Sequence, residues 1–136
     1  MNPKRVPTRR EPPGSARLFM RKAEEFFRAA LANLADRRWN AAALSAIHAA
    51  ISAADASLVF AKGMRSASQR HDEIADLLAE AVPDAAPALP HLRQILGKKH
   101  LVEYESRLFA ESESRALVQH AERFLHWVRS QIGPAA

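Results

Sequence analysis

The stretch from Trp39 to Gly63, WNAAALSAIHAAISAADASLVFAKG, decides the fold because it is the longest apolar, alanine-rich segment of the chain. Its larger apolar side chains recur at spacings of three and four, which places them on one face of a helix. The residues of this stripe are Leu44, Ile47, Ile51, Ala54 and Leu58. Alanine leaves little side-chain bulk, so neighbouring helices can approach closely. We therefore predict a central helix over about residues 40–61, with Asn40 as its N-cap and Gly63 as its stop.

A second helix is predicted before this segment, over about residues 16–36, with Ser15 as its N-cap. Its apolar positions fall on one face, and charged residues occupy the other. The predicted apolar face consists of Phe19, Ala23, Phe26, Phe27, Ala30 and Leu34. The connection over residues 37–40 is short, so the first two helices should be antiparallel neighbours.

Three further helices are predicted after Gly63. The first covers about residues 69–82, with Ser68 as its cap and Pro83 at its end. The second covers about 89–109 and contains Gly97, which indicates a bend. The third covers about 112–132, with Ser112 as its cap. No strand pattern is evident, so the sequence predicts an all-α, antiparallel up-and-down bundle of four to five helices in one domain over residues 15–133.

Residues 1–14 are predicted to be a disordered basic arm. Four prolines exclude a helix there, and four basic residues against one acidic residue give the arm +3 of the chain's net charge of +5. Such an arm is either a solvated leader or a segment that contacts nucleic-acid phosphates. Because the remainder carries only +2, the overall charge is weak evidence for nucleic-acid binding by the folded part.

The composition excludes several classes of protein. The chain has no cysteine, which rules out disulfides, cysteine-ligated zinc and thiol nucleophiles. We expect no apolar run long enough to cross a bilayer and no signal peptide, and hence a cytoplasmic protein. The six histidines include no pair spaced by four residues and no HExxH motif, so no metal and no cofactor are predicted.

Three polar residues, His48, Ser52 and Asp55, interrupt the apolar central helix and lie on one of its faces. Their residue types suggest a nucleophilic triad. However, a single helix presents them as a row with serine in the middle, whereas a triad requires the histidine to bridge the other two. We therefore interpret them as a polar seam at a contact between helices or between subunits.

The order of segments AALSAIHAAISAADA, KGMRSASQRH and GKKHLVEY, followed by an amphipathic last helix, resembles the HEPN family over about residues 15–132. The resemblance implies a helical bundle that usually forms homodimers. Many members are RNA-cleaving toxins or defence effectors, and some pair with a nucleotidyltransferase-type antitoxin. Other members have lost catalysis and act as binding or assembly modules.

Active members of the family carry an Arg-x4–6-His motif, which the resemblance assigns to residues 98–104 of this chain. One register places Lys98 and Glu103 at the motif positions, and the other places Lys99 and Tyr104 there. Lysine does not bind phosphate through a planar fork as arginine does, and neither glutamate nor tyrosine titrates near neutrality as histidine does. The motif is therefore absent from this segment.

Two literal matches to the motif lie elsewhere, at Arg65–His71 and Arg115–His120. Residues five apart on a regular helix point about 140° apart, so Arg115 and His120 should not converge within one chain. A ribonuclease that uses either match across a two-fold interface is the alternative hypothesis.

The leading hypothesis is a catalytically degenerate prokaryotic HEPN-like homodimer that binds RNA or a partner protein, in a toxin–antitoxin or defence setting. Its proposed binding residues are Lys98, Lys99, His100 and Tyr104. A third hypothesis is a purely structural subunit whose polar seam fixes the dimer register.

Overall fold

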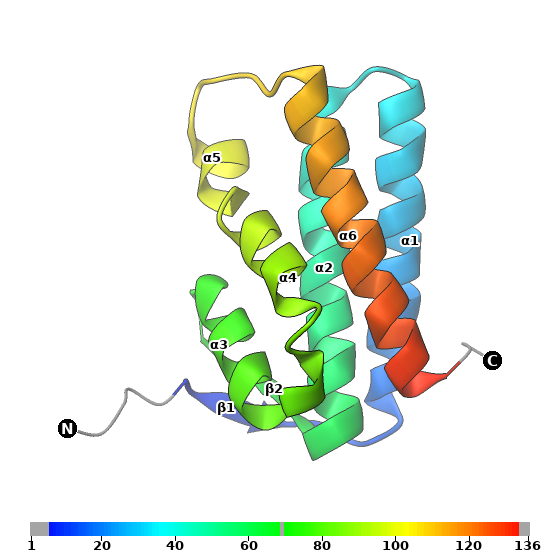
Figure 1. Cartoon of the computed structure of the whole chain (residues 1–136), viewed down its shortest axis with the longest axis vertical. Helices are drawn as coiled ribbons and strands as arrows, with labels where there is room; N and C mark the ends of the chain where they lie inside the picture. The colour runs from blue at the N-terminus through cyan, green and yellow to red at the C-terminus, as the bar shows by residue number, and fades with distance from the viewer. Residues whose placement is uncertain (1–5, 69, 134–136) are drawn as a thin grey trace.

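A computed structural model describes residues 6–68 and 70–133 of the chain. Within these residues the fold is an all-α bundle with one small sheet, as Figure 1 shows. The helices are α1 (Ser15–Ala35), α2 (Trp39–Lys62), α3 (Asp72–Ala81), α4 (Leu89–Leu96), α5 (Lys99–Tyr104) and α6 (Glu111–Ile132). A 3-10 turn, η1 (Pro83–Ala85), joins α3 to α4. The predicted fold class is confirmed.

Helix α2 is the central helix of the bundle, as the sequence predicted. It packs along α1 and α6, and α3, α4 and α5 lie beside it (Figure 1). Of its 24 residues, 14 are buried, and most of these are alanines. Larger side chains from the neighbouring helices fill the space around them, among them Phe27, Leu92 and Phe124.

The expectation that no apolar run could span a membrane was wrong for α2. This helix has a mean hydropathy of 1.5 over its most apolar window, and its length and composition meet the requirement for a membrane span. However, 72% of that window is buried inside the fold. The apolar character of α2 is therefore accounted for by its position in the core.

The predicted helix ends are partly correct. Gly63 ends α2 in the left-handed conformation, with φ of 63°, and its N–H donates to the carbonyl of Val59 at 2.9 Å. The predicted caps Ser15, Asn40 and Ser112 were wrong, because each lies inside its helix, which begins at or before that residue.

The side chain of Asn40 instead joins two distant segments. Its Oδ1 accepts a hydrogen bond from the backbone N–H of Phe109 at 3.0 Å. At the start of α6, the carboxylate of Glu113 accepts the N–H of Ala110 at 3.0 Å and thereby satisfies an otherwise free donor of the first turn.

The prediction that residues 1–14 are disordered was wrong for the part of the arm that the structure describes. Strand β1 (Thr8–Arg10) pairs antiparallel with β2 (Met64–Ser66), with Thr8 opposite Ser66. Residues 1–5 lie outside the described part. Prolines at 7 and 12 flank β1 and exclude a helix, but they leave an extended strand possible.

The helix predicted over 89–109 is two short helices. Gly97 and Lys98 separate α4 from α5, and the backbone is extended at Glu105, directly after α5. The predicted bend at Gly97 is thus a full break. The helix predicted over 69–82 begins only at Asp72, and Gln69 lies outside the described residues.

Candidate functional site

The residues predicted to bind a ligand meet in a surface hollow between α3 and the α4–α5 junction. The hollow has a volume of about 410 Å³. Its lining residues are His71, Asp72, Leu96, Gly97, Lys99, His100 and Tyr104. Three of the four predicted binding residues therefore line it. The break at Gly97 also lies at this hollow, which the first and last residues of α5, Lys99 and Tyr104, both line.

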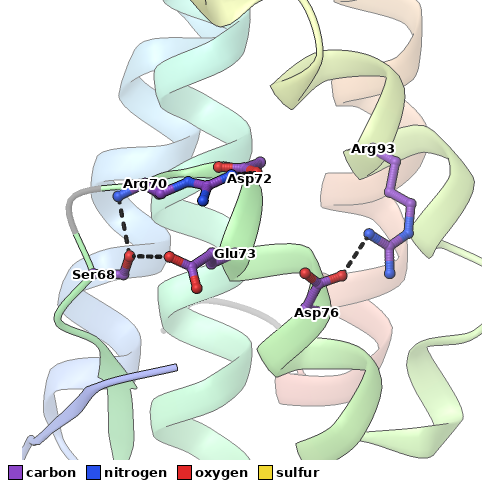
Figure 2. A network of polar contacts seen from close by, with 6 residues as sticks. All are labelled: Ser68, Arg70, Asp72, Glu73, Asp76 and Arg93. Atoms are coloured by element: carbon purple, nitrogen blue, oxygen red, sulfur yellow. Dashed lines mark hydrogen bonds and ion pairs between the residues drawn. The ribbon is translucent and has the colours of Figure 1, made fainter. Parts of the chain in front are cut away.

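A network of polar contacts fixes the turn that presents His71 (Figure 2). The Ser68 hydroxyl accepts the N–H of Arg70 at 3.0 Å and donates to Glu73 at 2.8 Å. Arg70 also pairs with Asp72 at 3.0 Å. Ser68, predicted as the helix cap, thus organises the turn before α3, whereas His71 occupies the N-cap position itself.

A second ion pair holds α3 against α4. Arg93 Nη1 lies 2.9 Å from Asp76 Oδ1, as Figure 2 shows. Because His71 directly precedes α3 and α4 leads into α5, this exposed pair links the two elements that border the hollow.

An ion pair occupies the segment in which the family motif was expected. Lys99 Nζ lies 2.8 Å from Glu103 Oε1, and both side chains are half-buried, at 15% and 19% exposure. The hydrogen bond from Lys99 lowers the pKa of Glu103. The carboxylate therefore stays ionised at neutral pH and satisfies the lysine beside it.

The two exposed rings of α5 lie together at the mouth of the hollow. The centroids of His100 and Tyr104 are 5.2 Å apart, and Tyr104 is 70% exposed. His100 Nε2 is 3.5 Å from Glu105, a contact that becomes an ion pair when the histidine is protonated.

The charges of Lys99 and Lys98 each lower the pKa of a neighbouring group. Burial, and then the charge of Lys99, lowers the pKa of His71, so its imidazole is neutral at pH 7. Lys98 does not line the hollow. Its charge instead acts on Glu113, whose pKa is lowered to about 2, chiefly by the hydrogen bond from Arg107.

The polar seam of α2 divides between two environments. His48 is half-buried, with its ring centroid 5.5 Å from that of Phe26. Phe26, predicted to be in the core, is 37% exposed. Ser52 and Asp55 are buried about one turn and two turns further along the helix.

Asp55 forms an ion pair with Arg65 and not with His48. Burial raises the pKa of Asp55 to about 6, although Arg65 opposes the shift from 3.9 Å away. Arg65 donates through Nε to Glu11 at 2.9 Å, and its guanidinium lies 5.2 Å from the ring centroid of Phe19. Glu11 follows β1, so this cluster ties the N-terminal strand to the bundle.

Neither literal Arg–His match forms a joint site within the chain. Arg65 faces Glu11 and Asp55, whereas His71 lines the hollow with Lys99. The two residues therefore have different neighbours.

Arg115 and His120 also diverge, as their spacing predicted. Arg115 donates to Glu111 at 2.8 Å, whereas His120 faces His91 on α4 with 2.9 Å between their Nδ1 atoms. The ring centroids of the two histidines are 5.2 Å apart, about the Nδ1 separation plus one ring radius on each side. The two Nδ1 atoms therefore face each other almost in line.

Sequence reasoning missed two features of the site. The position of His71 in the hollow depends on the packing of α3 against the α4–α5 junction, and no local pattern indicates it. The His91–His120 pair joins residues 29 apart on separate helices, which only the tertiary fold brings together. Within residues 6–68 and 70–133 there is no group of three or more histidine or carboxylate side chains that could hold a metal ion.

These features define an all-α bundle with an open, partly basic hollow between α3 and the α4–α5 junction. The chain belongs to the HEPN domain family, whose family model matches residues 16–131. The resemblance inferred from the sequence is thus confirmed, and the protein is a helical module of a nucleotide- or RNA-related class. A comparison of the chain with curated proteins finds no match.

Proposed function

We propose that this chain is a catalytically inactive HEPN-family module that binds single-stranded RNA at the hollow beside α5. The observation that carries the proposal is the Lys99–Glu103 ion pair at 2.8 Å. It lies in the segment where active relatives are expected to carry an arginine and a histidine. Glutamate held ionised by a neighbouring lysine is a poor proton donor for a leaving ribose oxygen.

The exposed rings of α5 support binding of unpaired bases. Aromatic side chains stack on bases with little sequence preference, and each stack contributes roughly 1–3 kcal/mol. Tyr104 and His100 offer two such rings beside Lys99. A duplex would hide the base faces, so the ligand that fits is a single strand.

The engagement of both candidate arginines supports the absence of cleavage. Arg65 pairs with Glu11 and Asp55, and Arg115 pairs with Glu111. A guanidinium already satisfied by carboxylates is less available to stabilise the extra charge of a phosphorane-like transition state.

An active ribonuclease is the second candidate, and one observation favours it. His71 and His100 line the same hollow, and the lowered pKa of His71 keeps a neutral imidazole available as a general base. This candidate predicts that the wild type cleaves single-stranded RNA without added metal and that His71→Ala abolishes the cleavage. If intact RNA is recovered after prolonged incubation at high protein concentration, the candidate is wrong.

Assembly is a further part of the proposal. Family membership supports a homodimer and a nucleotidyltransferase-type partner. Sedimentation equilibrium of the chain alone tests the dimer, and a monomer at micromolar concentration would contradict it. In the purely structural alternative the protein is also a dimer, but it has no RNA affinity and Asp55→Leu dissociates it.

Binding of a labelled single-stranded RNA to the wild type and to the Lys98→Ala/Lys99→Ala double variant tests the proposed function. We expect at least a tenfold loss of affinity and a shallower dependence on salt, because fewer counterions are released. The matched control is Arg17→Ala/Arg21→Ala, which removes two exposed charges from α1. Equal losses in both variants would mean that binding reflects overall charge and not the segment around α5.

A further inference from the structure

A second group of cations gathers around one tryptophan at the connection between α1 and α2. The guanidinium carbon of Arg37 lies 5.8 Å from the Trp39 ring centroid, and that of Arg115 lies 5.6 Å from it. Arg37 comes from the connection and Arg115 from the first two turns of α6. Figure 1 shows this connection and the start of α6 at the same end of the bundle.

The tryptophan is firmly held. Its backbone carbonyl accepts a hydrogen bond from the fully buried hydroxyl of Ser114 at 2.7 Å. Asn40, the next residue, is fixed by the N–H of Phe109. Trp39 therefore presents its half-buried ring at a defined place, and the two guanidinium groups are positioned against it.

Arg37 has an unusual backbone conformation. Its φ is 60°, and it is the one non-glycine residue with positive φ in the described chain. It directly follows the C-cap of α1, and its N–H donates to the carbonyl of Leu34 at 3.0 Å. Glycine is favoured at such positions because a Cβ is strained there. Glycine would adopt this backbone conformation with less strain than arginine. An advantage of arginine at position 37 must therefore come from its side chain.

We propose that Arg37, which lies with Arg115 beside the ring of Trp39, forms a second phosphate-binding site for the backbone of the bound RNA. This inference rests on the proposed function. A cation–π contact with a ring does not use the N–H donors of a guanidinium, so those donors can still make the paired hydrogen bonds that phosphate oxygens accept. Glu111 accepts the Nε–H of Arg115, so Arg37 makes the larger contribution. Asp36, the nearest carboxylate in sequence, lies 4.0 Å from Arg38.

The deciding variant is Arg37→Gly, because a structural role and a binding role predict opposite results. Relief of the left-handed strain should raise the midpoint of thermal unfolding. Loss of the guanidinium should weaken binding of a labelled single-stranded RNA about fivefold. Arg28→Ala, which removes the same charge from the exposed surface of α1, is the control and should change affinity less than twofold. A more stable Arg37→Gly protein with unchanged RNA affinity would overturn the site.

Inorganic tripolyphosphate provides a readout that does not depend on RNA. In a Trp127→Phe background, the fluorescence of Trp39 should change on titration with tripolyphosphate, and Arg37→Gly should remove the change. If RNA binds and only the Lys98→Ala/Lys99→Ala variant weakens it, the second site is wrong and the proposed function stands. If RNA fails to bind but the tripolyphosphate response depends on Arg37, the phosphate site stands and the proposed function is wrong. If neither ligand binds, both are wrong.

Discussion

Helix α2 and helix α5 differ in length, in burial and in the chemistry of their side chains. Helix α2 is long, apolar and buried, and its alanines allow neighbouring helices to pack closely. Helix α5 has six residues, none of them buried, and carries an ion pair and two exposed rings. Under the proposed function, stability and ligand contact are therefore assigned to separate parts of this bundle. Substitutions in α2 should therefore change folding, and substitutions in α5 should change binding.

The largest expected effect is in α2. Leu58→Ala removes a fully buried side chain and leaves a cavity that the surrounding helices fill only partly. We expect a loss of about 3 kcal/mol in the free energy of unfolding, measured by urea denaturation. Leu101→Ala on half-buried α5 is the matched control and should cost about 1 kcal/mol. Equal costs at both sites would remove the distinction between the two helices.

A smaller effect is expected from Asp55, the buried carboxylate of α2. Its pKa in the folded protein is about 6, above the value of 3.8 for the free group. The folded state therefore holds the proton more tightly, and stability from this group falls as pH rises from about 4 to 6. Asp55→Asn should avoid that loss and raise the free energy of unfolding at pH 8 by about 1–2 kcal/mol.

The comparison of wild type and Asp55→Asn needs a low-pH control. At pH 4 both side chains are neutral in the fold, so the two proteins should have nearly the same stability. If Asp55→Asn is less stable than the wild type at pH 8, the Arg65–Asp55 attraction outweighs the cost of burial.

A third effect comes from the histidine pair between α4 and α6. Burial, with the nearby His91, lowers the pKa of His120. The unfolded chain therefore binds the proton first, and this contribution to stability is lost as pH falls below about 6.5. His120→Gln should flatten the loss of stability between pH 7 and pH 5. His71→Gln tests the other imidazole with a lowered pKa, and the two reductions should be additive because the sites are separate.

The smallest effect on stability is expected in α5. Lys99→Met removes one member of an ion pair spaced by four residues, which contributes at most about 0.5 kcal/mol on a helix surface. RNA affinity should nevertheless fall. A stability loss above 2 kcal/mol would assign the Lys99–Glu103 pair to the core and would contradict the division between the two helices.

The sequence predicts the bundle well because the evidence for it is local. The helical spacing of apolar residues in α2 and the stop at Gly63 depend on neighbours along the chain. The exposure of Phe26 could not be predicted, because its position on the apolar face of α1 is indistinguishable from that of Phe27 until α2 is docked. Strand β1 was missed because its pairing with β2 joins residues more than 50 positions apart.

The candidate site was predicted only for the residues that lie close together in the sequence. Lys99, His100 and Tyr104 stand out as a basic and aromatic segment within seven residues. His71 was identified only as half of an Arg–His match, and its true neighbours come from the docking of α3 beside α5. The orientation of Arg115 toward Trp39 also depends on the packing of α6 against the start of α2.

The central claim, that α5 binds single-stranded RNA without cleaving it, is most directly tested by ultraviolet crosslinking followed by peptide mapping. A labelled single strand should crosslink to the peptide that carries His100 and Tyr104, and the RNA should be recovered at full length. Tyr104→Ala should reduce the crosslink yield severalfold. Crosslinks confined to other peptides, or recovery of shortened RNA that depends on His71, would contradict the account.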